Sequence, residues 1–209
     1  MAINLLTISR RRVLLGLPLA ACVLAGAALA QAPETVRIRA SIDSINGDVL
    51  ALTTRQGEKL SLTIKADARI VAIVPIALDA IKSGSYVGSA AMGQPDGTLR
   101  ALEVHVFPEA MRGTGDGHRP FDLQPGSTMT NGMVGEVIGT AGRTLKVSYG
   151  GGEKTVVVPP ETPVVTYEPG TRALLVKGAH LIATAARGAD GKLTADRLSV
   201  GKDGLVPPM

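Results

Sequence analysis

The chain has 209 residues, of which 45% are hydrophobic but only 2% aromatic, and it has no tryptophan. Its formal charge is +4, but residues 1–30 hold three arginines and no acidic residue, which leaves 19 basic against 18 acidic residues in the remainder. A core must therefore be built from Val, Ile, Leu and Ala. The nearly neutral remainder and the scarcity of aromatic residues argue against a nucleic-acid-binding surface.

Residues 1–30 have the pattern of a cleaved signal peptide. Arg10-Arg11-Arg12 precede an apolar run from Val13 to Leu29, which ends in the small-residue pattern Ala28-Leu29-Ala30. The run is short and rich in Ala and Gly for a permanent membrane span, which needs about 20 strongly apolar residues. We therefore expect cleavage near Ala30 and a periplasmic or secreted mature protein without a membrane span.

Two details of this segment leave alternatives open. Ser9 to Leu14 resembles a twin-arginine export signal, although an ordinary basic signal start has the same residues. Leu19-Ala20-Ala21-Cys22 matches a lipoprotein box, but Val23 to Ala30 stays apolar, which favours the soluble form over lipidation of Cys22. Cys22 is the one cysteine of the chain, so the mature form would have neither a disulfide nor thiolate chemistry.

Residues 31–106 have the pattern of five short strands. Apolar and polar residues alternate from Val36 to Asp43, which predicts a half-buried strand. Turn signals at Asn46-Gly47, Gln56-Gly57-Glu58 and Asp96-Gly97 separate further strands. These strands are predicted at 49–53, 60–64 with an extension over 69–74, 86–90 and 99–106. Pro75 to Lys82 predicts one or two helical turns between the third and fourth strands.

The second half repeats the first. Residues 132–200 align with 37–106 at a shift of 95, which falls to 94 after a one-residue deletion, and Asn46-Gly47 then falls on Ala141-Gly142. The tripeptide Gly57-Glu58-Lys59 recurs at 152–154, and the helical turn recurs at 172–177. Three strands, a short helix and two strands are typical of OB-type barrels. The sequence thus predicts an all-β chain of two tandem, small, OB-like five-stranded β-barrels, each with one short helix, at 31–106 and 132–200.

A family resemblance rests mainly on the linker between these halves. The sequence HVFPEAMRGTGDGHRPFDLQPGSTMTNG at 105–132 and the ending VGKDGLVPPM at 200–209 resemble an exported bacterial family catalogued as domain of unknown function 5666. The resemblance implies a β-barrel of the periplasm or cell envelope, with no established activity. Some relatives are labelled metal transporter permeases, but a permease needs several membrane spans, and this sequence has none beyond the signal.

The linker at 107–131 is the candidate binding region. Gly113 to Arg119 would expose backbone N–H groups beside an arginine, which is a pattern of anion-binding nests, although a solvated glycine-rich connector would look the same. The linker contains two prolines, Pro108 and Pro120, and two phenylalanines, Phe107 and Phe121. This composition favours an ordered clasp over a flexible tether. The predicted ligand-binding residues are Arg112, Asp116, His118, Arg119 and Asp122.

A metal site is the alternative use of the linker. The candidate ligands are His105, Glu109, Asp116 and His118, which would suit zinc or copper. No recognised ligand spacing is present, and Pro108 prevents His105 and Glu109 from sharing a regular helix face. We therefore expect no cofactor, with zinc or copper as the alternative.

The sequence predicts a binding protein rather than an enzyme. It has no mature cysteine, no G-x-S-x-G, no P-loop, no H-E-x-x-H and no dinucleotide fingerprint. The expected function is a non-enzymatic binding or interaction module of the bacterial cell envelope, with an envelope protein or a small ligand as partner and no nucleic acid. The alternative is a periplasmic metal-binding or metal-transport accessory protein. Residues 201–209 are either a loose tail or a docked segment.

Overall fold

The computed structural model describes residues 34–138 and 143–209, and within these ranges the regular structure is almost entirely β-strand. The strands before residue 121 are β1 (Thr35–Asn46), β2 (Val49–Thr54), β3 (Lys59–Pro75), β4 (Tyr86–Gly93), β5 (Leu99–Phe107) and β6 (Gly117–Pro120). Those after it are β7 (Thr128–Ile138), β8 (Thr144–Tyr149), β9 (Gly152–Val157), β10 (Val164–Pro169), β11 (His180–Arg187) and β12 (Leu193–Gly201). The prediction of an all-β chain is confirmed.

Helical structure in the described ranges consists of single turns of 3-10 helix. They are η1 (Leu78–Ala80), η2 (Glu109–Met111), η4 (Arg172–Leu174) and η5 (Lys202–Gly204). Two of them, η1 and η4, lie within the segments predicted to be helical. No helix within 34–138 and 143–209 has the length and apolar character to cross a membrane. The predicted signal peptide with Cys22, and the Ala141-Gly142 turn, lie outside the described residues.

Five strands close into a barrel, which we call the first barrel. They hydrogen-bond in the order β1, β2, β3, β12, β11, and β11 pairs back with β1. The β3–β12 pair is parallel and the other four pairs are antiparallel. The interior holds aliphatic side chains, as predicted for a narrow barrel; its largest fully buried members are Ile42, Leu50, Leu52, Leu62, Ile64, Leu181 and Leu198.

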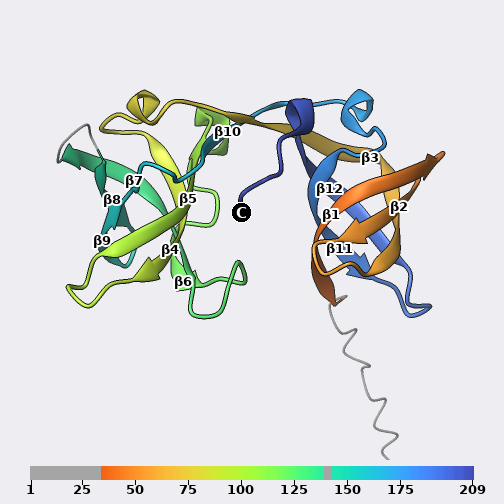
Figure 1. The fold of residues 1–209 in the computed structure, drawn as a ribbon, viewed down its shortest axis with the longest axis horizontal. Coiled ribbons are helices and arrows are strands. Elements are labelled where there is room, and N and C mark those ends of the chain that lie inside the picture. The colour runs from red at the N-terminus through yellow and green to blue at the C-terminus, as the bar shows by residue number, and fades with distance from the viewer. Residues whose placement is uncertain (1–33, 139–142) are drawn as a thin grey trace, which may run out of the picture. The chain divides into compact units, whose positions relative to one another are not determined.

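Five of the other seven strands form a second ring on the opposite side of the view in Figure 1. Its order is β7, β8, β9, β5, β4, and β4 pairs back with β7. The parallel β5–β9 pair is short, joining Leu99 to Val156 and Arg100 to Val157. Its interior is again aliphatic, with Val87, Val104, Val134, Leu145, Val147 and Val156 fully buried.

The first barrel and the second ring each contain strands from both halves of the chain. The prediction that residues 31–106 and 132–200 each form a barrel of their own is therefore wrong. β1, β2 and β3 close with β11 and β12, whereas β4 and β5 close with β7, β8 and β9. The cause is the length of β3, which runs for 17 residues at about 3.3 Å per residue. It carries the chain beyond the first barrel, and β4 and β5 therefore pair with other strands.

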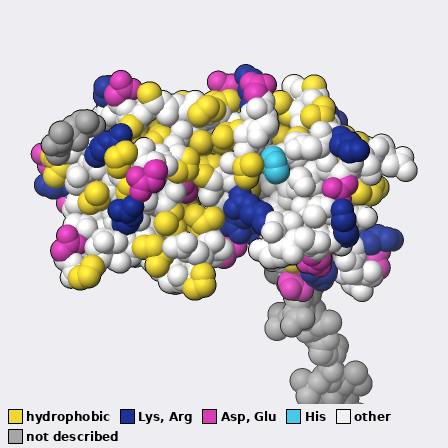
Figure 2. Space-filling view, viewed as in Figure 1, with side chains coloured by type: hydrophobic (Ala, Val, Ile, Leu, Met, Phe, Trp, Pro, Cys, Tyr) yellow, Lys and Arg dark blue, Asp and Glu magenta, His cyan; other side chains and the backbone are white. Residues whose placement is uncertain are grey.

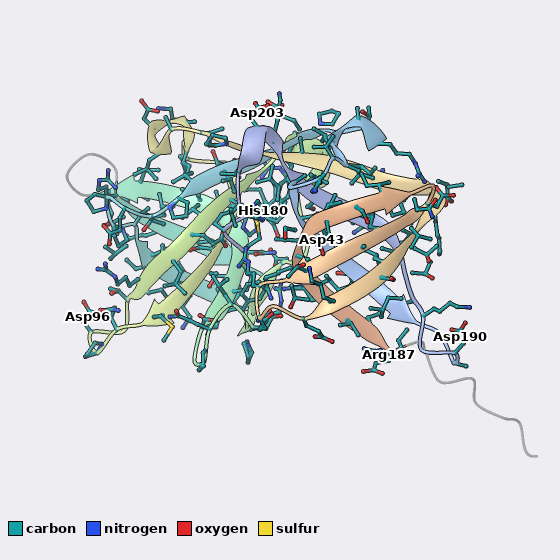
Figure 3. The ribbon with its side chains drawn as sticks, turned by 45° about the vertical axis from the view of Figure 1, so that its right-hand side comes forward. Asp43, Asp96, His180, Arg187, Asp190 and Asp203 are labelled. Carbon is teal, nitrogen blue, oxygen red and sulfur yellow. The ribbon has the colours of Figure 1, made fainter. Side chains whose placement is uncertain are left out.

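The two closures are related by an approximate two-fold arrangement centred on the β3–β10 pair. Ile73 pairs there with Tyr167, Val71 with Pro169 and Pro75 with Val165, so adding 94 to each β3 number and subtracting 94 from each β10 number reproduces the same pairs. Figure 3 shows the equivalent turn residues Asp96 and Asp190 at opposite ends of the molecule.

The register corrects the sequence alignment at the first hairpin of each half. Asn46 pairs with Val49 across two turn residues, whereas Ile138 pairs with Thr144 across five. The strand before the turn therefore aligns at a shift of 92 rather than 95. Thus Arg39 of β1 corresponds to Asn131 of β7, and Arg37 corresponds to Met129.

Candidate functional site

The outer face of the first barrel presents arginine side chains across four neighbouring strands. Register partners on β3, β12, β11 and β1 place these side chains in two adjacent rows, because alternate residues of a strand point to the same face. One row is Val71, Ser199, Ile182 and Arg39, which are successive register partners. The other joins the partners Arg69 and Arg197 to the partners Thr184 and Arg37, with Thr184 at the register shift of the β11–β12 pair.

Arg69 and Arg197 are direct partners on the parallel strands β3 and β12. Neither guanidinium forms an ion pair or hydrogen bond with another described side chain. Like charges placed side by side on a sheet destabilise the pair. Their juxtaposition without a carboxylate is therefore costly for the fold and favours an anionic ligand.

Arg37 and Arg39 fasten the linker to the first barrel. Asp122 Oδ1 lies 3.2 Å from Arg37 Nη1 and 2.7 Å from Arg39 Nη2, and Arg39 Nη1 donates to Asp122 Oδ2 at 3.0 Å. Both guanidinium groups also lie over the Phe121 ring, at 4.9 and 5.6 Å from its centre. The hydrogen bond from Arg39, followed by the charges of Arg39 and Arg37, lowers the pKa of Asp122 despite partial burial.

The corresponding outer face of the second ring carries a different set of side chains. Val165, His105, Gly88 and Asn131 form the row that matches Val71, Ser199, Ile182 and Arg39. Glu103 lies two residues before His105 and corresponds to Arg197 of the first barrel. The arginine face and this histidine face border the same cavity, so the approximate symmetry of the backbone is not kept by the side chains.

His105 is held by a fully buried carboxylate. Its Nδ1 lies 3.0 Å from Oε2 and 3.2 Å from Oε1 of Glu103, and Oε1 also accepts a hydrogen bond from the backbone N–H of Ala90 at 2.9 Å. Glu103 is 0% exposed and His105 is 4% exposed. The imidazole packs edge-on against Phe107 and Tyr167. Burial raises the pKa of Tyr167, with the charge of Glu103 as the second cause.

Gly88 makes room for the His105 ring. A Cβ atom at this position would lie 2.1 Å from His105 Nε2 and 2.6 Å from Asn131 Oδ1. Both polar atoms therefore converge on the space above this glycine. Asn131 Nδ2 donates to the backbone oxygen of Thr114 at 3.0 Å, but its Oδ1 is buried without a hydrogen-bond partner in the described structure.

The two faces and the linker enclose a cavity of about 370 Å³, within the range of small-molecule sites. Its polar lining includes five arginines together with His105 and Asn131. Its apolar lining comes from both faces and from the linker: Val71, Phe107, Met111, Phe121, Met129, Tyr167, Ile182 and Met209. Figure 2 shows basic and hydrophobic side chains together near the middle of one face of the molecule. The lining suits an anion with an apolar body.

Residues 205–209 are docked, so the loose-tail interpretation is wrong. The main-chain oxygen of Met209 accepts a hydrogen bond from Arg39 Nε at 3.0 Å, and that of Pro207 accepts one from Arg55. The Met209 side chain is buried with Ile73 and Val165. Burial, followed by the charge of Arg39, lowers the pKa of Arg55.

The predicted ligand-binding residues of the linker are not gathered in one place. Arg119 lines the cavity and donates a hydrogen bond to the backbone oxygen of Gly115. Asp122 forms ion pairs with Arg37 and Arg39, which also line the cavity. Arg112 instead pairs with Glu109 at 2.7 Å, and Asp116 accepts hydrogen bonds from Tyr86 Oη and the backbone N–H of Gly150. The last of the five, His118, contacts Thr130 and Tyr149 outside the cavity.

The four predicted metal ligands also have separate partners. His105 faces Glu103, Glu109 pairs with Arg112, and Asp116 and His118 make the contacts just given. Burial, followed by the charge of Lys154, lowers the pKa of His118. Within 34–138 and 143–209 no three His, Cys, Asp or Glu residues are grouped so that they could hold a metal ion.

Sequence reasoning missed most of the cavity. Arg37 and Arg39 were assigned only to the polar face of a strand, and Arg69, Arg197 and Asn131 were not singled out. The available signal was the placement of Arg37 and Arg39 at alternate positions of one strand, whereas Arg69 and Arg197 follow Asp67 and Asp196 closely in the sequence and gave no such signal. Comparisons with protein-family models, with curated proteins and with solved structures found no match to this chain.

Proposed function

We propose that this protein is a non-enzymatic binding module of the bacterial cell envelope, and that its ligand is a small anion with an apolar body. The observation that carries the proposal is the Arg69–Arg197 pair, which lies on the cavity without a carboxylate partner among the described residues. The location rests on the signal-like residues 1–30. The resemblance to exported β-barrel proteins is consistent with this location.

Charge complementarity supports an anion. Arginine is suited to carboxylate and phosphate groups because its planar guanidinium donates two parallel hydrogen bonds. An anion bridging Arg69 and Arg197 would remove their mutual repulsion and add charge-assisted hydrogen bonds, each contributing about 1.5–3 kcal/mol. Asp122 already offsets Arg37 and Arg39, so the uncompensated charge lies at the other end of the arginine face.

The cavity walls support a small molecule rather than a macromolecule. Methionine and aromatic side chains cover the space between the two faces, and its volume suits a compact ligand. Nucleic acid is a poorer fit, because the chain beyond residue 30 has a net charge of +1 and few aromatic residues to stack on bases.

The test is a titration of residues 31–209 with benzoate and with phenyl phosphate, followed by isothermal calorimetry or amide chemical shifts. Arg69→Gln/Arg197→Gln should weaken binding at least about tenfold, since about 1.4 kcal/mol corresponds to that factor. The matched control is Arg100→Gln/Arg187→Gln, which removes the same charge from arginines paired with Glu161 and Glu34. Equal binding by the two double variants would contradict the proposed site.

A further inference from the structure

The wall opposite the arginines presents two hydrogen-bond acceptors that have no assigned role. In the neutral tautomer whose ring proton lies on Nδ1, His105 donates to the Glu103 carboxylate and Nε2 is left as an acceptor. Asn131 uses its amide nitrogen on the backbone oxygen of Thr114 and keeps Oδ1 without a partner.

The backbone brings these two acceptors together over one residue. Gly88 is the register partner of both His105 and Asn131, so the three lie in one row across β5, β4 and β7. The Cβ that Gly88 lacks would lie within 2.6 Å of both His105 Nε2 and Asn131 Oδ1. The His105 ring therefore fills the space above Gly88, and a donor that enters from the cavity, which His105 and Asn131 both line, meets the two acceptors close together.

The orphaned oxygen is the second, independent observation at this cavity. Asn131 is 4% exposed and lines the cavity together with His105. A buried acceptor without a hydrogen-bond partner destabilises the fold, so the unpaired Oδ1 favours a ligand that supplies a donor. Surrounding arginine charge disfavours an ammonium group, which leaves a neutral donor.

We propose that the ligand is a hydroxylated anion: its acidic group binds Arg69 and Arg197, and its hydroxyl donates to Asn131 Oδ1 or His105 Nε2. This inference rests on the proposed function and adds the second recognition element. The arginine face selects the charge, the apolar lining contacts the body of the ligand, and the row above Gly88 selects the hydroxyl. A site built to bind a hydroxyl discriminates strongly against an analogue that lacks one.

The test compares four probes on residues 31–209: benzoate, 3-hydroxybenzoate, 4-hydroxybenzoate and 4-methoxybenzoate. We expect at least one hydroxybenzoate to bind about tenfold tighter than benzoate, because its hydroxyl adds one hydrogen bond and gives the buried acceptor a partner. The methoxy compound, which has no donor, should bind no tighter than benzoate. The preference should be lost in Asn131→Leu or in His105→Phe, according to which of the two acceptors the hydroxyl binds.

The outcomes separate this inference from the proposed function. Equal arginine-dependent binding of all four probes to the unmodified protein overturns the hydroxyl preference and leaves the anion site in place. A hydroxyl preference that persists in folded Asn131→Leu and in folded His105→Phe also overturns it. Absence of arginine-dependent binding for every probe overturns the proposed function and this inference with it. The unmodified protein suffices for the first comparison, so the test does not depend on the folding of a variant.

Discussion

At the scale of single residues, the cavity depends on residue types that are unusual for their positions in a strand or in a buried environment. Gly88 lies inside a strand, where glycine lacks a side chain to pack, yet its missing Cβ gives His105 its place. Glu103 is buried among apolar residues, but His105 and the Ala90 N–H satisfy its oxygens. These exceptions lie together on one face of β4 and β5, which is typical of a functional surface.

Gly88→Ala should therefore be strongly destabilising for so small a change. The new methyl would overlap His105 and Asn131, and overpacking of this kind costs about 1–3 kcal/mol. Gly93→Ala is the matched control, because it lies on the same strand and its added Cβ would have no atom within 4 Å. Urea unfolding measures both variants, and equal free energies of unfolding would show that the His105 ring does not need Gly88.

At the scale of elements, the linker acts as a wall of the cavity. β6 pairs with β7, Phe121 lies under two arginines, and Asp122 binds the same arginines from the exposed side. Eight linker residues line the cavity, namely Phe107, Ala110, Met111, Thr114, Arg119, Phe121, Met129 and Asn131. The linker thus contributes to the cavity lining, whereas three of its five predicted ligand-binding residues, Arg112, Asp116 and His118, lie outside that lining.

The link between Asp122 and the arginines should make stability depend on pH. The folded-state pKa of Asp122 is lowered below 3.8 by the Arg39 hydrogen bond and the two arginine charges. Its stabilisation is therefore complete above about pH 4 and is lost as the pH falls through the lowered pKa. Because Asp122 is 54% exposed, we expect Asp122→Asn to cost only about 0.5–1 kcal/mol at pH 7.

Urea unfolding at pH 7 and at about pH 3 measures this dependence, with Asp67→Asn as the control. Asp67 is exposed and has no ion pair within the described parts of the chain. The difference between the unmodified protein and Asp122→Asn should narrow at the lower pH. A difference that grows there would contradict the assigned sign.

At the scale of the whole molecule, the exchange of strands between the halves is the central feature. β3 runs past the first barrel, and β10, its counterpart, is separated from β9 by a segment with prolines at 159, 160 and 163. Proline lacks the N–H that a strand ladder uses. The second half therefore forms two separate strands, β9 and β10, where the first half forms the single long strand β3. The two faces of the cavity thereby come from strands far apart in sequence.

Residues 31–106 expressed alone should not form a folded monomer. β1, β2 and β3 would lack β11 and β12, and β4 and β5 would lack their partners on β7 and β9. The fragment should be unfolded or should dimerise by exchanging the same strands between two copies. Circular dichroism and light scattering after size exclusion distinguish these states, with residues 31–209 as the folded control; a folded monomeric fragment would contradict the exchange.

The sequence by itself determined the strands, their turns and their aliphatic interior. Alternation at Val36 to Asp43 and the turn at Asn46-Gly47 predicted β1 and β2, because side-chain period and turn chemistry are local properties. The tertiary structure alone decided which strands pair. Local alternation specifies which face of a strand is buried but not which distant strand lies beside it, and so it could not bring Arg69 to Arg197 or set Asn131 opposite the arginines.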